Sequence, residues 1–191
     1  MIKQSQSPDE IALIQGAAQV GFVFKTKTSE TIEIMNIWSI YLLYISDQEE
    51  VWKLLLELPF DSTRKRMSVI VQRENSDDKN IYLMTKGADS SMLDRMMFTD
   101  ENLNHVKGLN KLKKGHLEKF AVEGLRTLVF SKKVLNDEYA LQFIERFKVL
   151  SLSDDRAKEK KIEMLFEDIE KDFIYIGSSA IEDKLQLVWT N

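Results

Sequence analysis

The chain has 191 residues, of which 43% are hydrophobic and 30% are charged, and this composition is typical of one globular domain with its own core. Its net charge of −4 provides no general basic face, which argues against nucleic acid as a partner. The absence of cysteine excludes disulfides, thiol catalysis and cysteine metal sites. The only histidines, His105 and His116, do not have the spacing of a structural zinc site.

The first half of the sequence predicts one helix followed by strands that return as hairpins. Ser7, Pro8 and Glu10 fit the N-cap, N1 and N3 positions of a capping box, and the apolar stripe after them predicts a helix over Pro8–Val20. Alternating side chains place Leu54, Leu56, Leu58 and Phe60 on one face of a strand. The expected strands are 22–26, 30–38 with a continuation over 39–45, 51–60, 64–73 and 81–85, with turns at 47–50 and 61–63 and a polar loop at 74–80.

The second half predicts more helix than strand. Gly124 marks the end of a helix, and a strand is expected to follow it directly. The expected helices are 88–96, 100–123, 137–150 and 156–170, and the expected strands are 125–134 and 172–177. Because most strands arrive as hairpins and do not alternate with helices, the predicted fold class is α+β, an antiparallel sheet flanked by helices.

Several common sequence signatures are absent. The chain has no phosphate loop of the Gly-x-x-x-x-Gly-Lys type, no Gly-x-Gly-x-x-Gly and no Gly-x-Ser-x-Gly. Its most apolar stretch, Ile34–Ile45, has 12 residues, whereas a membrane-spanning helix needs about 20. We therefore expect no membrane span or signal peptide in this sequence, and any nucleotide would be bound by a different design.

The segment from Phe60 to Arg66 combines an aromatic residue with three consecutive cations at a strand turn. Such a combination suits a planar base and an anion: Phe60 could stack on the base, and Lys65 could meet a phosphate. The alternative interpretation is a solvated hairpin with Phe60 in the core. From this segment alone, the alternative is favoured.

Three further residues have both a functional and a structural interpretation. Lys86 ends a strand and precedes Gly87, so it could reach a ligand or simply point into water. Arg126 begins a strand and could bind phosphate or ribose oxygens, or it could form an ion pair with Glu123. Glu10 could contact a ligand or cap its own helix.

Taken together, five segments resemble P-type ATPases of the lipid-flippase class, the P4-ATPases. The segments are Ser7-Pro8-Asp9-Glu10, Phe60-Asp61-Ser62-Thr63-Arg64-Lys65-Arg66-Met67-Ser68-Val69, Lys86-Gly87-Ala88-Asp89, Glu123-Gly124-Leu125-Arg126-Thr127-Leu128 and Ala180-Ile181-Glu182-Asp183-Lys184-Leu185-Gln186. Each motif is weak alone, but five in the family's order over residues 7–186 are specific. The resemblance is to the nucleotide-binding domain of those pumps.

The resemblance implies an antiparallel sheet flanked by helices, with ATP as the ligand and Mg²⁺ accompanying it in the parent enzyme. The family's adenine-stacking aromatic falls on Phe60, its pocket lysines on Lys65 and Lys86, its phosphate- or ribose-side arginine on Arg126, and the glutamate near adenine on Glu10. Ser62 and Thr127 would be polar neighbours. The implied ATP-binding residues are thus Glu10, Phe60, Ser62, Lys65, Lys86, Arg126 and Thr127.

The resemblance also implies a domain organisation: residues 7–186 as the ATP-binding domain, 1–6 as an N-terminal stub and 180–191 as a hinge toward a phosphorylation domain. The Asp-Lys-Thr-Gly motif of the phosphorylated aspartate and the Thr-Gly-Glu-Ser motif are absent, so we expect no ATP hydrolysis by this chain alone. The expected partners are the phosphorylation and actuator domains of a membrane-embedded parent pump, with phospholipid and membrane contacted only through other segments.

One departure concerns the N-terminal edge of the sheet. In the family, further strands and a helix precede the Ser-Pro-Asp-Glu segment, whereas only six residues precede it here. Either the sheet lacks these N-terminal edge elements or the chain has compensated for them. This departure supports a second hypothesis, a regulatory or interaction fragment that keeps the fold but binds no nucleotide. A third hypothesis, an independent small kinase or hydrolase, lacks the expected phosphate loop, base and metal cluster.

Overall fold

The computed structural model describes residues 8–36, 48–74, 76–97 and 117–182. Its strands form one seven-stranded antiparallel sheet in which each strand pairs with the next along the chain, in the order β1-β2-β3-β4-β5-β6-β7. The α+β prediction is confirmed. The strands are β1 Phe22–Lys27, β2 Thr31–Asn36, β3 Gln48–Asp61, β4 Arg66–Arg73, β5 Ile81–Gly87, β6 Arg126–Leu135 and β7 Ile174–Ile181.

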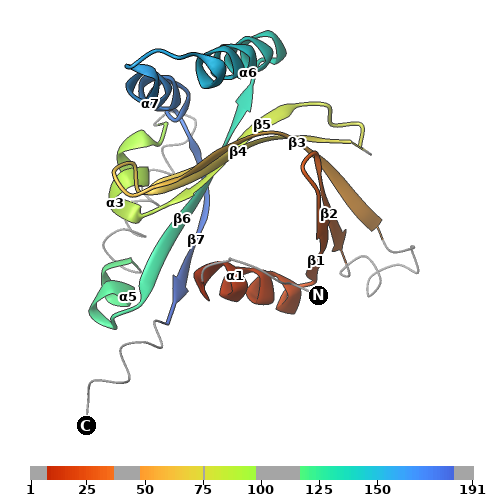
Figure 1. Cartoon of the computed structure of the whole chain (residues 1–191). Helices are drawn as coiled ribbons and strands as arrows, with labels where there is room; N and C mark the ends of the chain where they lie inside the picture. The colour runs from red at the N-terminus through yellow and green to blue at the C-terminus, as the bar shows by residue number, and fades with distance from the viewer. Residues whose placement is uncertain (1–7, 37–47, 75, 98–116, 183–191) are drawn as a thin grey trace. The chain divides into compact units, whose positions relative to one another are not determined.

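The helices and the sheet divide between two compact units. Unit 1 comprises residues 1–55 and 71–81, and unit 2 comprises residues 56–70 and 82–191. The helices are α1 Pro8–Gln19 in unit 1 and α3 Asp89–Met92, the 3₁₀ helix η1 Leu93–Arg95, α5 Glu118–Val122, α6 Asp137–Leu152 and α7 Lys158–Ile169 in unit 2 (Figure 1). Among the described residues, none of these helices combines the length and apolar character that crossing a membrane requires.

Unit 1 is built on two consecutive strand pairings. β1 and β2 pair antiparallel from Phe22 opposite Asn36 to Lys27 opposite Ile32, with a shift in register after Phe24. The turn between them is held by the Thr28 hydroxyl, which accepts hydrogen bonds from the backbone N–H groups of Glu30 and Thr31. α1 packs on β1, as expected for a helix whose apolar positions recur every three or four residues.

Unit 2 contains the ends of β3 and β4 that form their shared hairpin turn, together with most of β5 and all of β6 and β7. β6 and β7 lie side by side (Figure 1) and pair antiparallel from Arg126 opposite Ile181 to Lys132 opposite Ile174. The core of this unit is aliphatic and aromatic, and its fully or almost fully buried side chains include Leu58, Ile70, Leu83, Met92, Val129, Phe143, Ile169 and Phe173.

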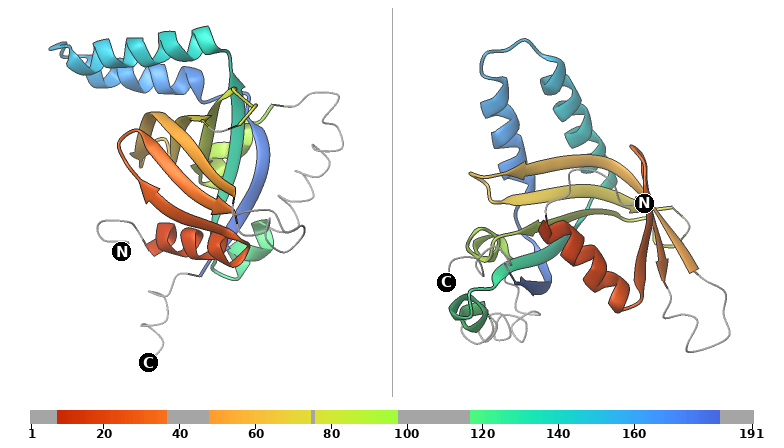
Figure 2. Two further views of the ribbon diagram at one scale, coloured as in Figure 1. Left: turned by 90° about the vertical axis from the view of Figure 1, so that its right-hand side faces the viewer. Right: turned by 60° about the horizontal axis from the view of Figure 1, so that its bottom comes forward.

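α6 and α7 run side by side in both views of Figure 2, joined by the short segment 153–157. The side chain of Asn136 caps α6 by accepting a hydrogen bond from the backbone N–H of Tyr139 at 3.2 Å. The rings of Phe147 and Phe166 stack across the pair, with their centroids 5.6 Å apart. The apolar stripe of α7, which includes Leu165 and Ile169, is buried.

Within the described residues, most predicted elements agree with the structure, and the differences lie mainly at their boundaries. The turn predicted at 47–50 is wrong over residues 48–50, because β3 already begins at Gln48. β4 begins at Arg66 and not at 64, since Arg64 and Lys65 complete the hairpin turn. The helix predicted at 88–96 divides into α3 and η1, and β7 starts later and ends later than predicted. Of the helix predicted at 100–123, the stretch 100–116 lies outside the described residues, as do both histidines, the strand 39–45, Ser7 and the predicted stub 1–6.

Candidate functional site

The turn between β3 and β4 presents the first part of the candidate site. The Asp61 carboxylate accepts hydrogen bonds from the backbone N–H groups of Arg64 at 2.8 Å and Thr63 at 2.9 Å. These bonds, that from Arg64 foremost, lower the pKa of Asp61 below its ordinary value. The Lys65 N–H donates to the Asp61 carbonyl at 2.7 Å, and Lys65 has a left-handed φ of 53°. Because β3 ends at Asp61 and β4 begins at Arg66, Phe60 lies opposite Met67 in this hairpin.

The two faces of β4 and β5 carry different kinds of residue. A hydrogen bond of 2.8 Å joins the hydroxyls of Ser68 and Thr85, and a Cβ placed on Gly87 would lie 2.6 Å from the Arg66 Cβ. Successive side chains alternate between faces, so Arg66, Ser68, Thr85 and Gly87 share one face. We call it the Glu170 face, because Arg66 on this face donates a hydrogen bond to Glu170.

The opposite face holds three of the predicted site residues. Met67 and Lys86 lie next to each other on this face, since their neighbours Arg66 and Gly87 pair on the Glu170 face, and Phe60 lies on the far side of Met67. Phe60 and Lys86 are therefore two strands apart, with Cα atoms roughly 10 Å from each other. We call this surface the Lys86 face.

Arg126 joins the Lys86 face from β6. The ammonium of Lys132 lies 5.6 Å from the centre of the Tyr82 ring, so Lys132 and Tyr82 share a face, and alternation places Arg126 on it too. Antiparallel pairing also brings the start of β6 beside the end of β5, where Lys86 lies. Thr127, by the same alternation, lies on the opposite face.

The structure therefore brings together three of the seven predicted residues on one surface. Phe60 is 65% exposed, so the alternative interpretation that placed its ring in the core is wrong. Lys86 is half-buried, and Arg126 is exposed. Ser62 and Lys65 are exposed in the hairpin turn next to this surface, whereas Glu10 lies half-buried in the first turn of α1 and belongs to unit 1.

A buried charge cluster on the Glu170 face was not predicted from the sequence. The Glu170 side chain is completely buried and accepts hydrogen bonds from Arg64 Nη1 at 2.8 Å, Arg66 Nε at 2.7 Å and Ser68 Oγ at 2.6 Å. The Arg64 guanidinium also lies 4.9 Å from the centre of the Phe166 ring on α7. Two of the three consecutive cations are thus structural, and only Lys65 is exposed.

Glu167, one turn earlier on α7, extends this cluster. It accepts hydrogen bonds from Arg66 Nη2 and Arg95 Nη2, and Arg95 also donates to the backbone carbonyl of Glu170 at 3.0 Å. Burial opposes ionisation of Glu167, but the hydrogen bonds from the two arginines outweigh it and lower the pKa of the carboxyl below its ordinary value. The cluster therefore joins α7 to β4 and to η1.

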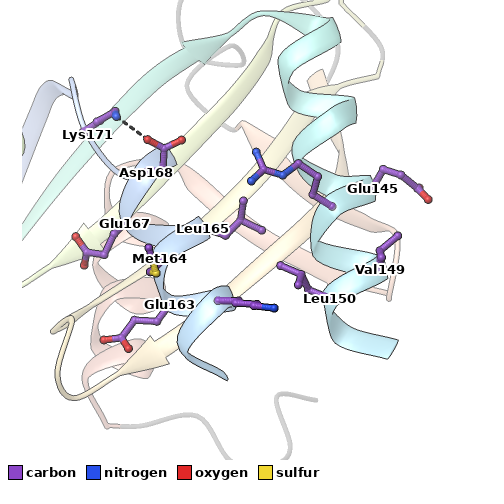
Figure 3. Close-up of a pocket in the computed structure, with 11 residues that line it drawn as sticks. Glu145, Val149, Leu150, Glu163, Met164, Leu165, Glu167, Asp168 and Lys171 are labelled. Carbon is purple, nitrogen blue, oxygen red and sulfur yellow. Dashed lines mark hydrogen bonds and ion pairs between the residues drawn. The ribbon is translucent and has the colours of Figure 1, made fainter. Parts of the chain in front are cut away.

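Two cavities lie in unit 2. A groove of about 1050 Å³ runs between α6 and α7 and is lined by apolar side chains such as Val149 and Met164 (Figure 3). A polar cavity of about 610 Å³ borders Lys65 and the residues of the Glu170 cluster. Phe60, Lys86 and Arg126 line neither cavity, and the described residues contain no cluster of three or more potential metal ligands.

Comparison with known proteins identifies the family. Residues 1–187 match the family model for P-type ATPase, cytoplasmic domain N. The human protein named probable phospholipid-transporting ATPase IM is 38% identical over 188 residues, covering 97% of this chain and 14% of that protein. Phospholipid-transporting ATPase FetA of mouse is 35% identical and phospholipid-transporting ATPase 10 of Arabidopsis thaliana is 33% identical, over 97% and 96% of this chain and 14% of each relative.

The matches extend over both units and all seven strands of the sheet, and the chain spans only about 14% of the length of these relatives. The antiparallel α+β architecture agrees with this assignment. The chain belongs to the cytoplasmic domain N family of the P-type ATPases.

Proposed function

We propose that this chain is the ATP-binding domain of a phospholipid-translocating P-type pump. Its similarity to proteins named phospholipid-transporting ATPases supports the type of pump. One observation supports the binding site itself: the exposed ring of Phe60, the Lys86 side chain and Arg126 lie on one face of the sheet, on three different strands. A ring and separated cations at this spacing suit a purine nucleotide.

Each residue would have a distinct role in binding. Phe60 would stack on adenine, an interaction that contributes about 1–3 kcal/mol in nucleic-acid systems. Lys86 would line the base and ribose, while Lys65 and Arg126 would meet the phosphates. Ser62, Thr127 and Glu10 remain predicted polar neighbours. Because only part of the nucleotide would be enclosed, we expect weak binding, in the sub-millimolar to millimolar range, or about 4–6 kcal/mol.

The domain would position the nucleotide and make no bonds itself. The γ-phosphate would be presented to the aspartate of a phosphorylation domain, and the actuator domain of the same cytoplasmic assembly would be a further partner. Residues 7–186 would form the ATP-binding domain, with 180–191 as the hinge. In the parent pump, Mg²⁺ would accompany the ATP phosphates.

Titration of the ¹⁵N-labelled chain with ATP and with adenosine, followed by NMR, tests this proposal. Both ligands should shift the resonances of Phe60 and Lys86, and Phe60→Ala should weaken both complexes. Lys65→Ala should weaken the ATP complex far more than the adenosine complex. Tyr139→Ala, which removes a partly exposed aromatic side chain on α6, is the matched control and should bind as the unmodified chain does.

A titration without chemical-shift changes would contradict the proposal. If saturating ATP leaves Phe60 and Lys86 unshifted, the chain is better described as a regulatory or interaction fragment that has kept the fold without the ligand. That outcome would leave the family membership intact, because membership rests on the sequence match and not on the ligand.

A further inference from the structure

Glu170 is a completely buried carboxylate to which the proposed function assigns no role. Both of its oxygens accept from Arg64 Nη1, each at 2.8 Å, and the Phe166 ring of the same helix packs against that guanidinium. Arg64 is only 5% exposed, so its charge has little access to water, and within the described part of the chain it forms its ion pair with Glu170. α7 therefore fixes the position of the Arg64 guanidinium from two directions.

Arg64 in turn holds the backbone beside Phe60. Its second terminal nitrogen, Nη2, donates to the carbonyl of Pro59 at 2.6 Å. That carbonyl belongs to the peptide group whose nitrogen is that of Phe60, so its position sets where the Phe60 Cα lies and in which direction its side chain leaves the strand. With 65% of its surface exposed, the Phe60 side chain has little packing of its own to hold it.

We propose that Glu170 is a positioning residue for Phe60, acting through Arg64 and the Pro59 carbonyl. This inference rests on the proposed function, because it assigns Glu170 to the adenine end of the same site. The carboxylate lies on the face of the sheet opposite to the ligand, so it orients the ring without touching the nucleotide. We therefore expect that loss of Glu170 weakens recognition of adenine more than recognition of the phosphates.

The test measures adenosine and ATP binding to the full 191-residue chain and to its Glu170→Gln variant. Glu170→Gln should raise the adenosine Kd about fivefold and reduce the upfield ring-current shift of the adenine H2 and H8 protons, while the ratio of the adenosine Kd to the ATP Kd stays the same. Glu163→Gln, on the exposed side of the same helix, is the matched control and should change neither quantity.

A double-mutant cycle separates positioning from general loosening of the fold. If Glu170 acts through the ring, adding Glu170→Gln to Phe60→Ala should change the adenosine Kd less than twofold beyond Phe60→Ala alone. An equal loss in both backgrounds would overturn the inference. So would an unchanged adenosine Kd and ring-current shift in the folded single variant.

Arg64→Lys provides a second route if Glu170→Gln does not fold. Lysine keeps the positive charge beside Glu170 but replaces the planar fork, whose two terminal nitrogens donate separately to Glu170 and to the Pro59 carbonyl, with a single nitrogen. The same loss of adenosine binding is therefore expected. A folded Arg64→Lys chain that binds adenosine normally would overturn the inference. If the unmodified chain binds no adenosine, the proposed function fails; if binding depends on Phe60 but not on Glu170, only this inference fails.

Discussion

The two faces of β4 and β5 differ in how deeply their charged side chains are buried. On the Glu170 face, Arg64 and Arg66 are buried and both donate to the Glu170 carboxylate, whereas on the Lys86 face the lysine is half-buried and the nearby Phe60 ring is exposed. The same short stretch, Phe60–Ser68, supplies both faces. Adjacent residues in one motif can therefore serve folding and ligand binding separately, and a run of like charges in a sequence need not form one site.

Removing the carboxylate of the Glu170 face should produce the largest effect on folding. Glu170→Ala leaves two buried guanidinium groups without their shared partner, which we expect to cost about 3–5 kcal/mol in the free energy of unfolding. Urea denaturation followed by circular dichroism measures this loss. Glu163→Ala, on the exposed side of α7, should change stability by less than about 0.5 kcal/mol. A loss below 1 kcal/mol for Glu170→Ala would mean that the cluster contributes little to the fold.

The close approach of β4 and β5 offers the next largest effect. A Cβ on Gly87 would lie 2.6 Å from the Arg66 Cβ and 2.8 Å from the Lys65 carbonyl oxygen, and the backbone atom cannot move cheaply. Gly87→Ala should therefore destabilise the chain by about 1–3 kcal/mol. Gly177→Ala in β7 is the matched control, because its Cβ would meet no atom within 4 Å. Equal unfolding midpoints for the two variants would contradict this account.

A smaller effect of opposite sign is expected at the hairpin turn. Lys65 adopts a left-handed φ of 53°, which is unfavourable for any residue with a Cβ. Lys65→Gly should be about 0.5–1 kcal/mol more stable than Lys65→Ala, although glycine also gives the unfolded chain more freedom. Thermal unfolding of the two variants separates the backbone cost from the role of the ammonium. If the alanine variant is the more stable one, the turn does not carry this strain.

The weakest effect concerns pH. The two arginines hold the pKa of Glu167 below its ordinary value in the folded chain, so the unfolded chain binds more protons near that value. This contribution to stability is present above the unfolded pKa and is lost as pH falls through the lowered folded pKa. Glu167→Gln should therefore flatten the fall in stability between about pH 6 and pH 3, measured by urea unfolding at each pH. An unchanged slope would show that other carboxyls dominate acid unfolding.

Local patterns were enough to predict most of the fold but not the chemistry of the Glu170 face. Alternation predicted the strands, and apolar periodicity predicted α6 and α7, because both signals depend on neighbours in sequence. Glu170 follows Arg64 by 106 residues, and nothing local connects them. One signal was available: Glu170 continues the apolar stripe of α7 four residues after Phe166, where an unpaired acid would be costly.

The candidate site, like the fold, could be predicted from the sequence only in part. The resemblance to a family pointed to Phe60, Lys86 and Arg126, and alternation on paired strands explains why these three residues share a face. The burial of Arg64 and Arg66 could not be deduced, since three consecutive cations beside a turn look equally exposed in a sequence. Glu10 lies in unit 1 and Thr127 on the opposite face from Arg126, so their roles remain predictions.

The strict alternation of β5 has a consequence for how its sequence can vary. Its odd-numbered residues are buried and its even-numbered residues, Tyr82, Met84 and Lys86, are only half-buried. A saturation mutagenesis library scored for protein abundance should show tolerance rising and falling with a period of two residues along this strand. Substitutions at the three half-buried positions, assayed one by one for ATP binding by NMR titration, should weaken binding at Lys86 alone, so that the needs of folding and of ligand binding would be assigned to different faces of this strand.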